Sequence, residues 1–350
     1  MSTGRYSVAF PRKWWYPACP SSELGRKPAG ITLMDRPLVV FRGKDGRPNA
    51  VLDRCAHRNA PLSMGAVRDG CIECPYHGWR YDGGGRCQAV PGLLNVGPSR
   101  TRDIESHATT ERDGFVWVWG EAGAEPTREP FPIPSLPGQI IFPCDLDCTL
   151  HAALENTLDV PHTAFLHRGV FRGNKPKELK AIRRNLPDGC EVEFVGETVG
   201  LGRLQGGPLA GKVFEHWDRF FLPSVAQVEY RVEDWLHIYN TVLHLPLSRF
   251  KTRAWFVLQW KSPVPPALIR PIVGLRGRKV LRQDAGMLAL QSERIHGFGG
   301  ERFTSTELDL LGGAIWRLLR QAERAEQADV SEGDEGDPLA LAEQEVTFRA

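Results

Sequence analysis

The sequence lacks the features by which several large classes of protein are recognised. No run of lysine or arginine is long enough to serve as a nucleic-acid-binding arm, and the formal net charge is only +2. No segment approaches the roughly 18 consecutive apolar residues of a membrane span. Residues 1–7 lack the basic-then-apolar order of a signal peptide. These absences predict a cytoplasmic protein with no nucleic-acid partner and no membrane span.

Two further absences concern nucleotides and disulfides. The chain has no internal repeat, phosphate loop or dinucleotide fingerprint, so we do not expect it to bind NADH directly through a βαβ unit. Its 8 cysteines, at positions 19, 55, 71, 74, 87, 144, 148 and 190, show no framework-like spacing. In a cytoplasmic protein, cysteines that cluster with histidines are better interpreted as metal ligands than as disulfides.

The 350 residues leave room for two domains. Short apolar segments separated by turn residues predict an all-β first domain over residues 1–125, including an N-terminal extension. Residues 126–140 are rich in proline and glycine and predict a linker. We expect a second domain over residues 141–330 and an acidic, mobile tail over residues 331–350.

The second domain mixes helical and strand patterns, so the predicted fold class is α+β. Apolar residues at helical spacing predict a helix over residues 149–158. Alternating segments between residues 191 and 261 predict an antiparallel sheet with one covered face. Two late helices are predicted, over residues 276–294 and 305–327. The second of them opens with a capping box from Thr304 to Glu307.

Four residues of the β domain have the spacing of a metal centre. Cys55 and His57 form a Cys-x-His pair, and sixteen residues later Cys74 and His77 form a Cys-x-x-His pair. Two thiolates and two imidazoles suit a Rieske [2Fe-2S] cluster, in which the thiolates hold one iron and the imidazoles hold the other. Such a cluster transfers single electrons at a moderate potential.

Zinc is the alternative for this group, because Cys71 and Cys74 form a Cys-x-x-Cys pair. That pair would leave His57 and His77 unused, and no second Cys-x-x-Cys follows at zinc-ribbon spacing. We therefore favour the Rieske cluster. Cys71 and the five cysteines outside the motif are interpreted as small buried side chains.

A second group of chemically active residues lies between residues 155 and 167. Asp159, His162 and His167 fall within nine positions, a grouping that is often no more than a polar patch. Two histidines and one carboxylate, with open positions, hold ferrous iron for O2 chemistry. His162 and His167 would lie about 140° apart on an ideal helix. They can converge only if the helix breaks or bulges between them, and Pro161 is a plausible cause.

Together these residues resemble the Rieske non-heme iron oxygenases, the aromatic-ring-hydroxylating α-subunit type. In that family the third iron ligand is an aspartate on a late helix. The stretch from Arg282 to Gln291 resembles this element, in the form found in the pheophorbide a oxygenase branch. The resemblance implies Asp284 as the ligand that completes the set with His162 and His167; the alternative is a solvated surface aspartate.

The resemblance also implies an architecture and an assembly. An all-β Rieske domain would precede a helix-grip (START-like) catalytic domain with an antiparallel sheet. Family members form head-to-tail homotrimers in which the cluster of one chain faces the iron of the next. Asp159 matches the bridging aspartate that would link His162 to His77 of a neighbouring chain. Asn156 matches an asparagine often found nearby, whose role stays open.

The activity implied is oxidation of a hydrophobic small molecule by O2 at Fe(II). The electrons would come from NAD(P)H through an external flavin-dependent reductase, directly or through a ferredoxin. The chain length favours the monooxygenase or demethylase type, which would hydroxylate, demethylate or oxidatively cyclise its substrate. Phe220, Phe221, Trp235 and Trp255 are candidate pocket residues. The alternatives are an electron-transfer protein and a ligand-binding protein with an unused iron site.

Overall fold

The computed structural model describes residues 6–94, 97, 99–167, 178–196, 214–328 and 343–349. Contacts divide the chain into two units, which are considered one at a time. The unit with the Cys/His motifs comprises Phe10–Pro132 and Leu245–Arg249; the other comprises Met1–Ala9, Ile133–His244 and Phe250–Ala350. Among the described residues, no helix is both long and apolar enough to cross a membrane.

The N-terminal residues group with the second unit, not with the β domain in which we had placed them. The backbone N–H and the hydroxyl of Ser7 both donate to Glu301 Oε2, at 2.7 and 2.6 Å. The Tyr6 ring packs edge-on against Phe250, with ring centroids 5.1 Å apart. These contacts explain why the segment leaves the β domain at about residue 10.

The unit with the Cys/His motifs consists of three small antiparallel sheets, as expected for an all-β domain. Two of them share a core of buried side chains that includes Val39, Phe41 and Ile72. The first sheet contains β1 (Trp15–Pro20), β11 (Phe115–Trp119) and β10 (Thr109–Arg112); the second contains β2 (Ala29–Leu33), β3 (Arg36–Arg42), β4 (Pro48–Leu52) and β9 (Ser106–His107); the third contains β5 (Ala66–Arg68), β6 (Cys71–Glu73), β7 (Arg80–Tyr81) and β8 (Cys87–Ala89).

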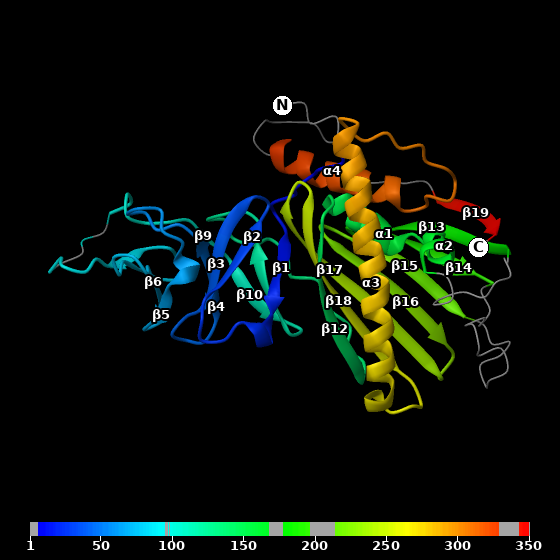
Figure 1. Ribbon diagram of the computed structural model, residues 1–350, viewed down its shortest axis with the longest axis horizontal. Coiled ribbons are helices and arrows are strands. Elements are labelled where there is room, and N and C mark those ends of the chain that lie inside the picture. Colours follow the sequence, from blue (N-terminus) through cyan, green and yellow to red (C-terminus); the bar gives the residue numbers. More distant parts are fainter. Residues whose placement is uncertain are drawn as a thin grey trace. The chain divides into compact units, whose positions relative to one another are not determined.

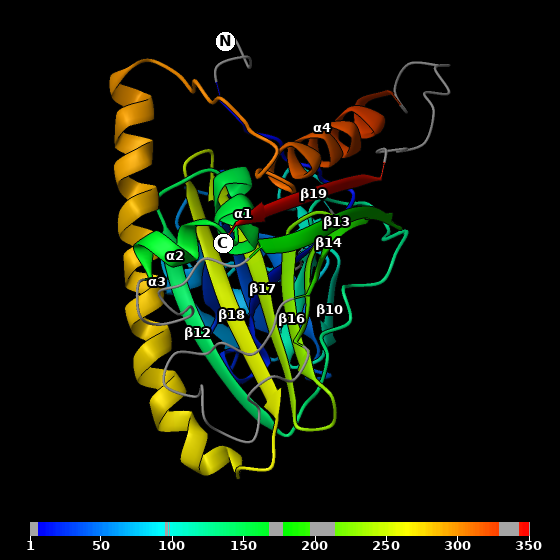
Figure 2. The same cartoon turned by 90° about the vertical axis from the view of Figure 1, so that its right-hand side faces the viewer.

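The second unit is built on one antiparallel sheet of eight strands, which confirms the expected sheet and the α+β class. Figure 1 and Figure 2 show this sheet with helix α3 (Pro266–Gly297) lying across one face. In spatial order the strands are β12 (Gly138–Leu146), β18 (Lys251–Lys261), β17 (Leu236–Ser248), β16 (Val225–Val232), β15 (Glu215–Phe221), β14 (Gly189–Val195), β13 (Glu178–Leu186) and β19 (Gln344–Arg349).

Close packing at Gly277 brings α3 against the edge strand β12. A Cβ at Gly277 would meet the Phe142 ring at 2.9 Å, so only a residue without a side chain allows this approach. One turn earlier, Gly274 lies over Ile140. The helix begins at Pro266, ten residues before the predicted start at residue 276. Pro265 is its N-cap and Pro266 lies in its first turn, where proline is tolerated.

Two expectations for the C-terminal part are corrected. Helix α4 (Gly312–Ala328) begins seven residues later than predicted, and the Thr304–Glu307 capping box does not form its start. Instead, the Thr306 N–H donates to the carboxylate of Asp309 at 2.5 Å, which makes a turn ahead of the helix. The connector between α3 and α4 is therefore longer than the sequence indicated.

The segment predicted as a mobile tail contains a strand. Residues 344–349 form β19, which pairs antiparallel with β13, and Lys180 Nζ lies 2.8 Å from Glu345 Oε1 across this pair. A strand that adds to a sheet edge satisfies its backbone hydrogen bonds there. The acidic part of the predicted tail, over residues 331–337, lies outside the described residues.

Candidate metal centres and the adjoining cavity

The predicted helix over residues 149–158 is present as α1 (Leu150–Leu158). Thr149 caps it, since its hydroxyl oxygen accepts from the backbone N–H of Ala152 at 3.1 Å. The chain leaves helical geometry at Asp159, with φ −90° and ψ 104°, two residues before Pro161. The short helix α2 (His162–Leu166) follows. Pro161 is the N-cap of α2 and so lies between the two helices.

The two histidines converge, but the break is not where we predicted it. His162 is the first residue of α2, and His167 follows its end with φ −109° and ψ 37°. Both backbone departures lie outside the pair instead of between its members. The two imidazole rings meet edge-on with centroids 5.1 Å apart, and His167 itself has left helical geometry.

Asp284 extends from α3 to the same point. Its Oδ1 lies 2.9 Å from His167 Nε2 and 3.6 Å from His162 Nε2. One ligand atom from each of His162, His167 and Asp284 lies within 4.8 Å of the others. His167 and Asp284 are buried, so Asp284 is not the solvated surface aspartate of the alternative interpretation. The three donors suit a divalent transition metal of the 2-His-1-carboxylate class.

The charges at this point favour a bound cation. Burial lowers the pKa of His162, but hydrogen bonds from its ring to Asp159 and Asp284 outweigh burial and raise that pKa to about 9. Burial also raises the pKa of Asp284, and its hydrogen bonds with His162 and His167 more than offset this and hold the pKa below its ordinary value. The negative field that stabilises a proton on His162 would equally stabilise a metal ion.

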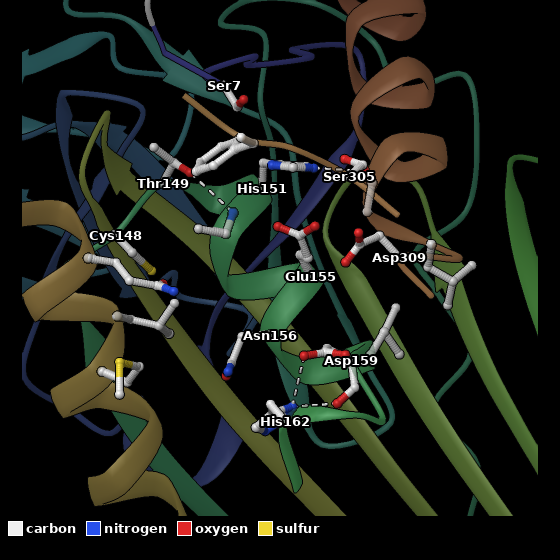
Figure 3. A pocket seen from close by; sticks show the side chains of 18 of the residues that line it. Ser7, Cys148, Thr149, His151, Glu155, Asn156, Asp159, His162, Ser305 and Asp309 are labelled. Atoms are coloured by element: carbon white, nitrogen blue, oxygen red, sulfur yellow. Dashed lines mark hydrogen bonds and ion pairs between the residues drawn. The ribbon is translucent and has the colours of Figure 1, made fainter. Parts of the chain in front are cut away.

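Asp159 touches His162 in two ways. His162 Nδ1 donates to the backbone carbonyl of Asp159, and the Asp159 carboxylate Oδ2 lies 3.4 Å from the same nitrogen. The carbonyl therefore orients the ring, while the carboxylate stays within reach of it. Figure 3 shows His162, Asp159 and Asn156 grouped at one end of α1.

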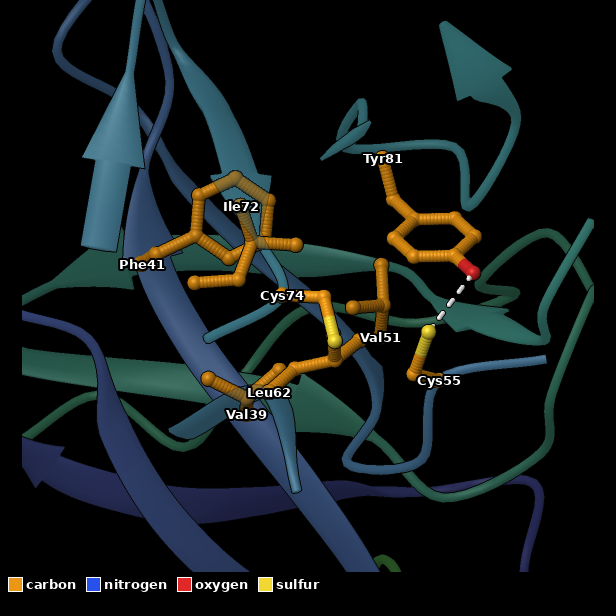
Figure 4. Close-up of a cluster of buried hydrophobic side chains, with 8 residues drawn as sticks. All are labelled: Val39, Phe41, Val51, Cys55, Leu62, Ile72, Cys74 and Tyr81. Atoms are coloured by element: carbon orange, nitrogen blue, oxygen red, sulfur yellow. Dashed lines mark hydrogen bonds between the residues drawn. The ribbon is translucent and has the colours of Figure 1, made fainter. Parts of the chain in front are cut away.

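In the other unit, two loops bring the Cys/His pairs together. Cys55 and His57 follow β4, while Cys74 and His77 lie between β6 and β7. The imidazole centroids of His57 and His77 are 4.6 Å apart. His57 Nδ1 is buried and has no hydrogen-bond partner among the described residues. This is expected of a nitrogen whose lone pair binds a metal. Both sulfurs are also buried (Figure 4), so this donor set fits a [2Fe-2S] cluster.

The other cysteines agree only partly with our interpretation. All eight are free thiols, and Cys19, Cys148 and Cys190 are buried. The remaining three outside the motif, Cys71, Cys87 and Cys144, are half-buried, so the prediction that all six are buried is wrong for them.

Tyr81 was not singled out from the sequence, although it lies against the cluster loops. Its hydroxyl is 3.3 Å from Cys55 Sγ (Figure 4) and accepts from the backbone N–H of Ala56 at 3.2 Å. Because Ala56 supplies a proton to the oxygen, the hydroxyl proton is left to donate to the sulfur. Burial and the neighbouring Cys55 raise the pKa of Tyr81, which keeps that proton in place.

Replacing Tyr81 with phenylalanine is expected to lower the reduction potential of a cluster held by Cys55. A hydrogen bond to a ligand sulfur stabilises the more negative reduced state, so its loss favours the oxidised state. A redox titration followed by visible circular dichroism measures the shift. Tyr76→Phe is the matched control, because it removes the same hydroxyl group from a tyrosine that is exposed in the same loop region. Equal potentials in the two variants would contradict the prediction.

A cavity of 1060 Å³ lies in the second unit, between α1, α2, α3 and the connector to α4. Apolar side chains form much of its wall, including Phe165, Phe194, Phe303 and Met287, and His162 reaches into it. None of the four aromatic residues proposed from the sequence lines it within the described chain. Phe220 and Trp255, for example, are 0% and 2% exposed and belong to the core.

Glu155 is a half-buried acid in the wall of this cavity. It projects from α1 into the same space as Asp309 (Figure 3), and Gly312 leaves room for it, since a Cβ there would meet its Oε1 at 2.0 Å. Burial, then the carboxylates of Asp309 and Asp159, raise the pKa of Glu155 to about 7. The raised pKa favours the protonated, neutral side chain up to about neutral pH.

The stability contributed by Glu155 should fall with rising pH. In the unfolded chain the pKa of a glutamate is ~4.3. Between that pH and about 7 the folded state therefore binds more protons than the unfolded state, and stability declines as the pH rises through this window. Glu155→Gln removes the effect. The variant should be more stable than the parent by roughly 3–4 kcal/mol above pH 7 and by little near pH 4. Melting curves at both pH values test this, with the exposed Glu293→Gln as control.

Two protein families match this chain, each over one of its parts. Residues 14–99 match the Rieske [2Fe-2S] domain, and residues 146–325 match the vanillate O-demethylase oxygenase C-terminal domain. The chain belongs to the Rieske oxygenases. Its two expected cofactors, a Rieske [2Fe-2S] cluster and a mononuclear iron, are those of this family.

Several named members of the family are similar to this Rieske oxygenase. Chlorophyllide a oxygenase of Oryza sativa subsp. japonica is 30% identical over 310 residues, which are 81% of this chain and 52% of that protein. The oxygenase component of dicamba O-demethylase from Stenotrophomonas maltophilia is 36% identical over 169 residues, which are 46% and 49% of the two chains. This chain thus spans about half the length of the curated relatives that it matches.

Solved structures support the fold. Dicamba monooxygenase bound to 3,6-dichlorosalicylic acid superposes with a TM-score of 0.75, at 22% identity, over 92% of this chain and all of that one. Methylxanthine N1-demethylase NdmA from Pseudomonas putida superposes with a TM-score of 0.69, at 22% identity, over 90% of this chain and 92% of that one. An all-β Rieske domain followed by a catalytic domain with a large antiparallel sheet is therefore confirmed.

Proposed function

We propose that this chain is the oxygenase component of a Rieske system that oxidises a hydrophobic small molecule with O2. The observation that carries the proposal is the convergence of His162, His167 and Asp284 beside a large, mainly apolar cavity. When bound there, a mononuclear iron supplies O2 activation, and the cluster supplies single electrons. The named relatives include demethylases, so we favour hydroxylation or demethylation of the substrate, with oxidative cyclisation as a further outcome of the same site.

The metal ligands are part of this proposal. Cys55, His57, Cys74 and His77 would hold the cluster, and His162, His167 and Asp284 would hold the iron. Support comes from the buried sulfurs and the unpaired His57 Nδ1 at the first site, and from the negative field at the second. In the second site each histidine turns Nδ1 toward an oxygen acceptor and Nε2 toward Asp284. The chain itself thus orients the lone pairs that a metal requires.

The partners follow from the need for electrons. We propose a flavin-dependent reductase that oxidises NAD(P)H, acting directly or through a ferredoxin, and a cytoplasmic setting. We also propose a homotrimer in which Asp159 accepts from His162 and from the cluster histidine His77 of a neighbouring chain. The exposed fraction of the Asp159 side chain, 37%, leaves it accessible to such a partner. Sedimentation at several concentrations tests the trimer.

Two measurements test the function. Iron analysis should give three irons per chain, two in the cluster and one mononuclear. A screen of small aromatic compounds, supplied with NADH and a reductase, should show substrate-dependent O2 uptake that His162→Ala abolishes while leaving the Rieske spectrum intact. Two irons and no uptake would favour the alternatives, an electron carrier or a ligand-binding protein, neither of which needs the convergence at Asp284.

A further inference from the structure

Gln283, on helix α3, contacts the end of α2 with both ends of its side-chain amide. Its Oε1 lies 3.1 Å from Nδ1 of His167, and its Nε2 donates to the backbone carbonyl of Leu166 at 3.0 Å. The residue is half-buried and immediately precedes Asp284. One side chain therefore bridges the helix that carries Asp284 and the backbone that presents His167.

The Leu166 carbonyl decides which way the amide points. A carbonyl oxygen can only accept a hydrogen bond, so the NH2 group of Gln283 must face it, and the amide oxygen must then face His167. That oxygen is also only an acceptor, so Nδ1 of His167 must carry the proton. With Nδ1 protonated, Nε2 is the nitrogen left to bind a metal, and it faces the carboxylate of Asp284, 2.9 Å from Oδ1.

We propose that Gln283 is a positioning residue for the mononuclear iron, because it fixes the tautomer and the ring orientation of His167. The inference rests on the proposed function and adds to it a residue outside the expected ligand set. Helix α3 would then fix two of the three ligands: Asp284 directly, and His167 through Gln283.

Comparison with His162 shows why this role can be tested at His167. Nδ1 of His162 also faces an oxygen, but that oxygen is the backbone carbonyl of Asp159, which no side-chain substitution removes. Nδ1 of His167 faces a side chain, which mutation can change without altering either ligand. Hydrogen-bond partners of metal-ligating histidines typically contribute about 10–100-fold in metal affinity.

The experiment compares Gln283→Met with Gln283→Glu in full-length protein with an intact cluster. Methionine matches the length of glutamine but cannot accept the Nδ1 proton, whereas a glutamate carboxylate can. Anaerobic Fe(II) titration against a chromophoric chelator should show affinity about 10–100-fold weaker for Gln283→Met and within a few fold of the parent for Gln283→Glu. Gln321→Met, at an exposed position on α4, is the matched control and should bind as the parent does.

A second readout separates orientation from general loosening. With Co(II) in the iron site, the ligand-field spectrum should change in Gln283→Met and match the parent in Gln283→Glu. Parental Fe(II) affinity in Gln283→Met would overturn the proposal, and so would equal loss in both variants, which would assign the role to the Leu166 contact. If Gln283→Met does not fold, Gln283→Leu replaces it. A parent chain that binds no third iron would instead refute the proposed function itself, so the two failures are distinguishable.

Discussion

Asp284→Ala is expected to remove the mononuclear iron and abolish turnover while leaving the Rieske cluster intact. Asp284 Oδ1 lies within 3.6 Å of both histidine Nε2 atoms, and the residue supplies the only carboxylate of the three converging groups in the described chain. Its loss leaves two neutral donors in a buried site. Iron content should fall from three to two per chain, and turnover by more than about 100-fold, beyond the cost of losing an outer hydrogen-bond partner.

The control for Asp284→Ala lies on the same helix. Glu293→Gln also removes a carboxylate from α3, but this side chain is 64% exposed and pairs only loosely with Arg294 at 3.9 Å. It should keep three irons and parental turnover. The visible spectrum of the cluster, recorded for both variants, shows whether the two metal sites are independent. A third iron retained by Asp284→Ala would mean that the carboxylate ligand is elsewhere.

Residue spacing predicted the cluster ligands and the histidine pair, whereas Asp284 was predicted from the family resemblance. It did not predict how the backbone makes them converge. The five-residue interval between His162 and His167 indicated a break between them, yet α2 is intact there and the chain departs from helical geometry on either side. Proline excludes helix from the residue before it, but the ring orientation that results depends on packing against α3.

The strands that the sequence did not reveal are the outer ones of the eight-stranded sheet, at or next to its edges. β12 contains Pro143, which argues against a strand except at an edge, and β12 is an edge strand. β13 includes Arg183, buried at 9% exposure, and so departs from the usual apolar alternation. β19 follows an acidic stretch whose composition suggested a tail. Several segments between them, such as β14, alternate apolar with polar residues, and the sheet was predicted from these.

Gln283 and Glu155 show why residue roles are harder to predict than ligand sets. Gln283 belongs to the stretch that resembles the family's late helix, but its contact with His167 depends on α3 packing against the end of α2, which the sequence does not reveal. Glu155 is one turn from Asp159 on α1, but its raised pKa comes from burial and from Asp309, 154 positions later. Both effects arise from tertiary contacts between segments distant in sequence.

Asp159→Asn is expected to keep both metals and to lower turnover by about 100-fold. The backbone carbonyl of Asp159, which orients His162, is unchanged by this substitution, so the iron site should persist. The carboxylate Oδ2, 3.4 Å from His162 Nδ1, is lost, and with it the acceptor proposed to join His162 to a neighbouring His77. Single-turnover experiments with a pre-reduced cluster measure the electron-transfer step directly.

The pattern of loss in Asp159→Asn separates two roles for this residue. If the carboxylate carries the path between metal sites, cluster reduction by the reductase should proceed normally while reoxidation in the presence of substrate and O2 slows. If the iron is lost instead, Asp159 helps to hold the metal and its assignment to the electron path is wrong. We expect the first result, because the asparagine variant keeps the backbone carbonyl of residue 159, which accepts from His162 Nδ1 and orients that ring.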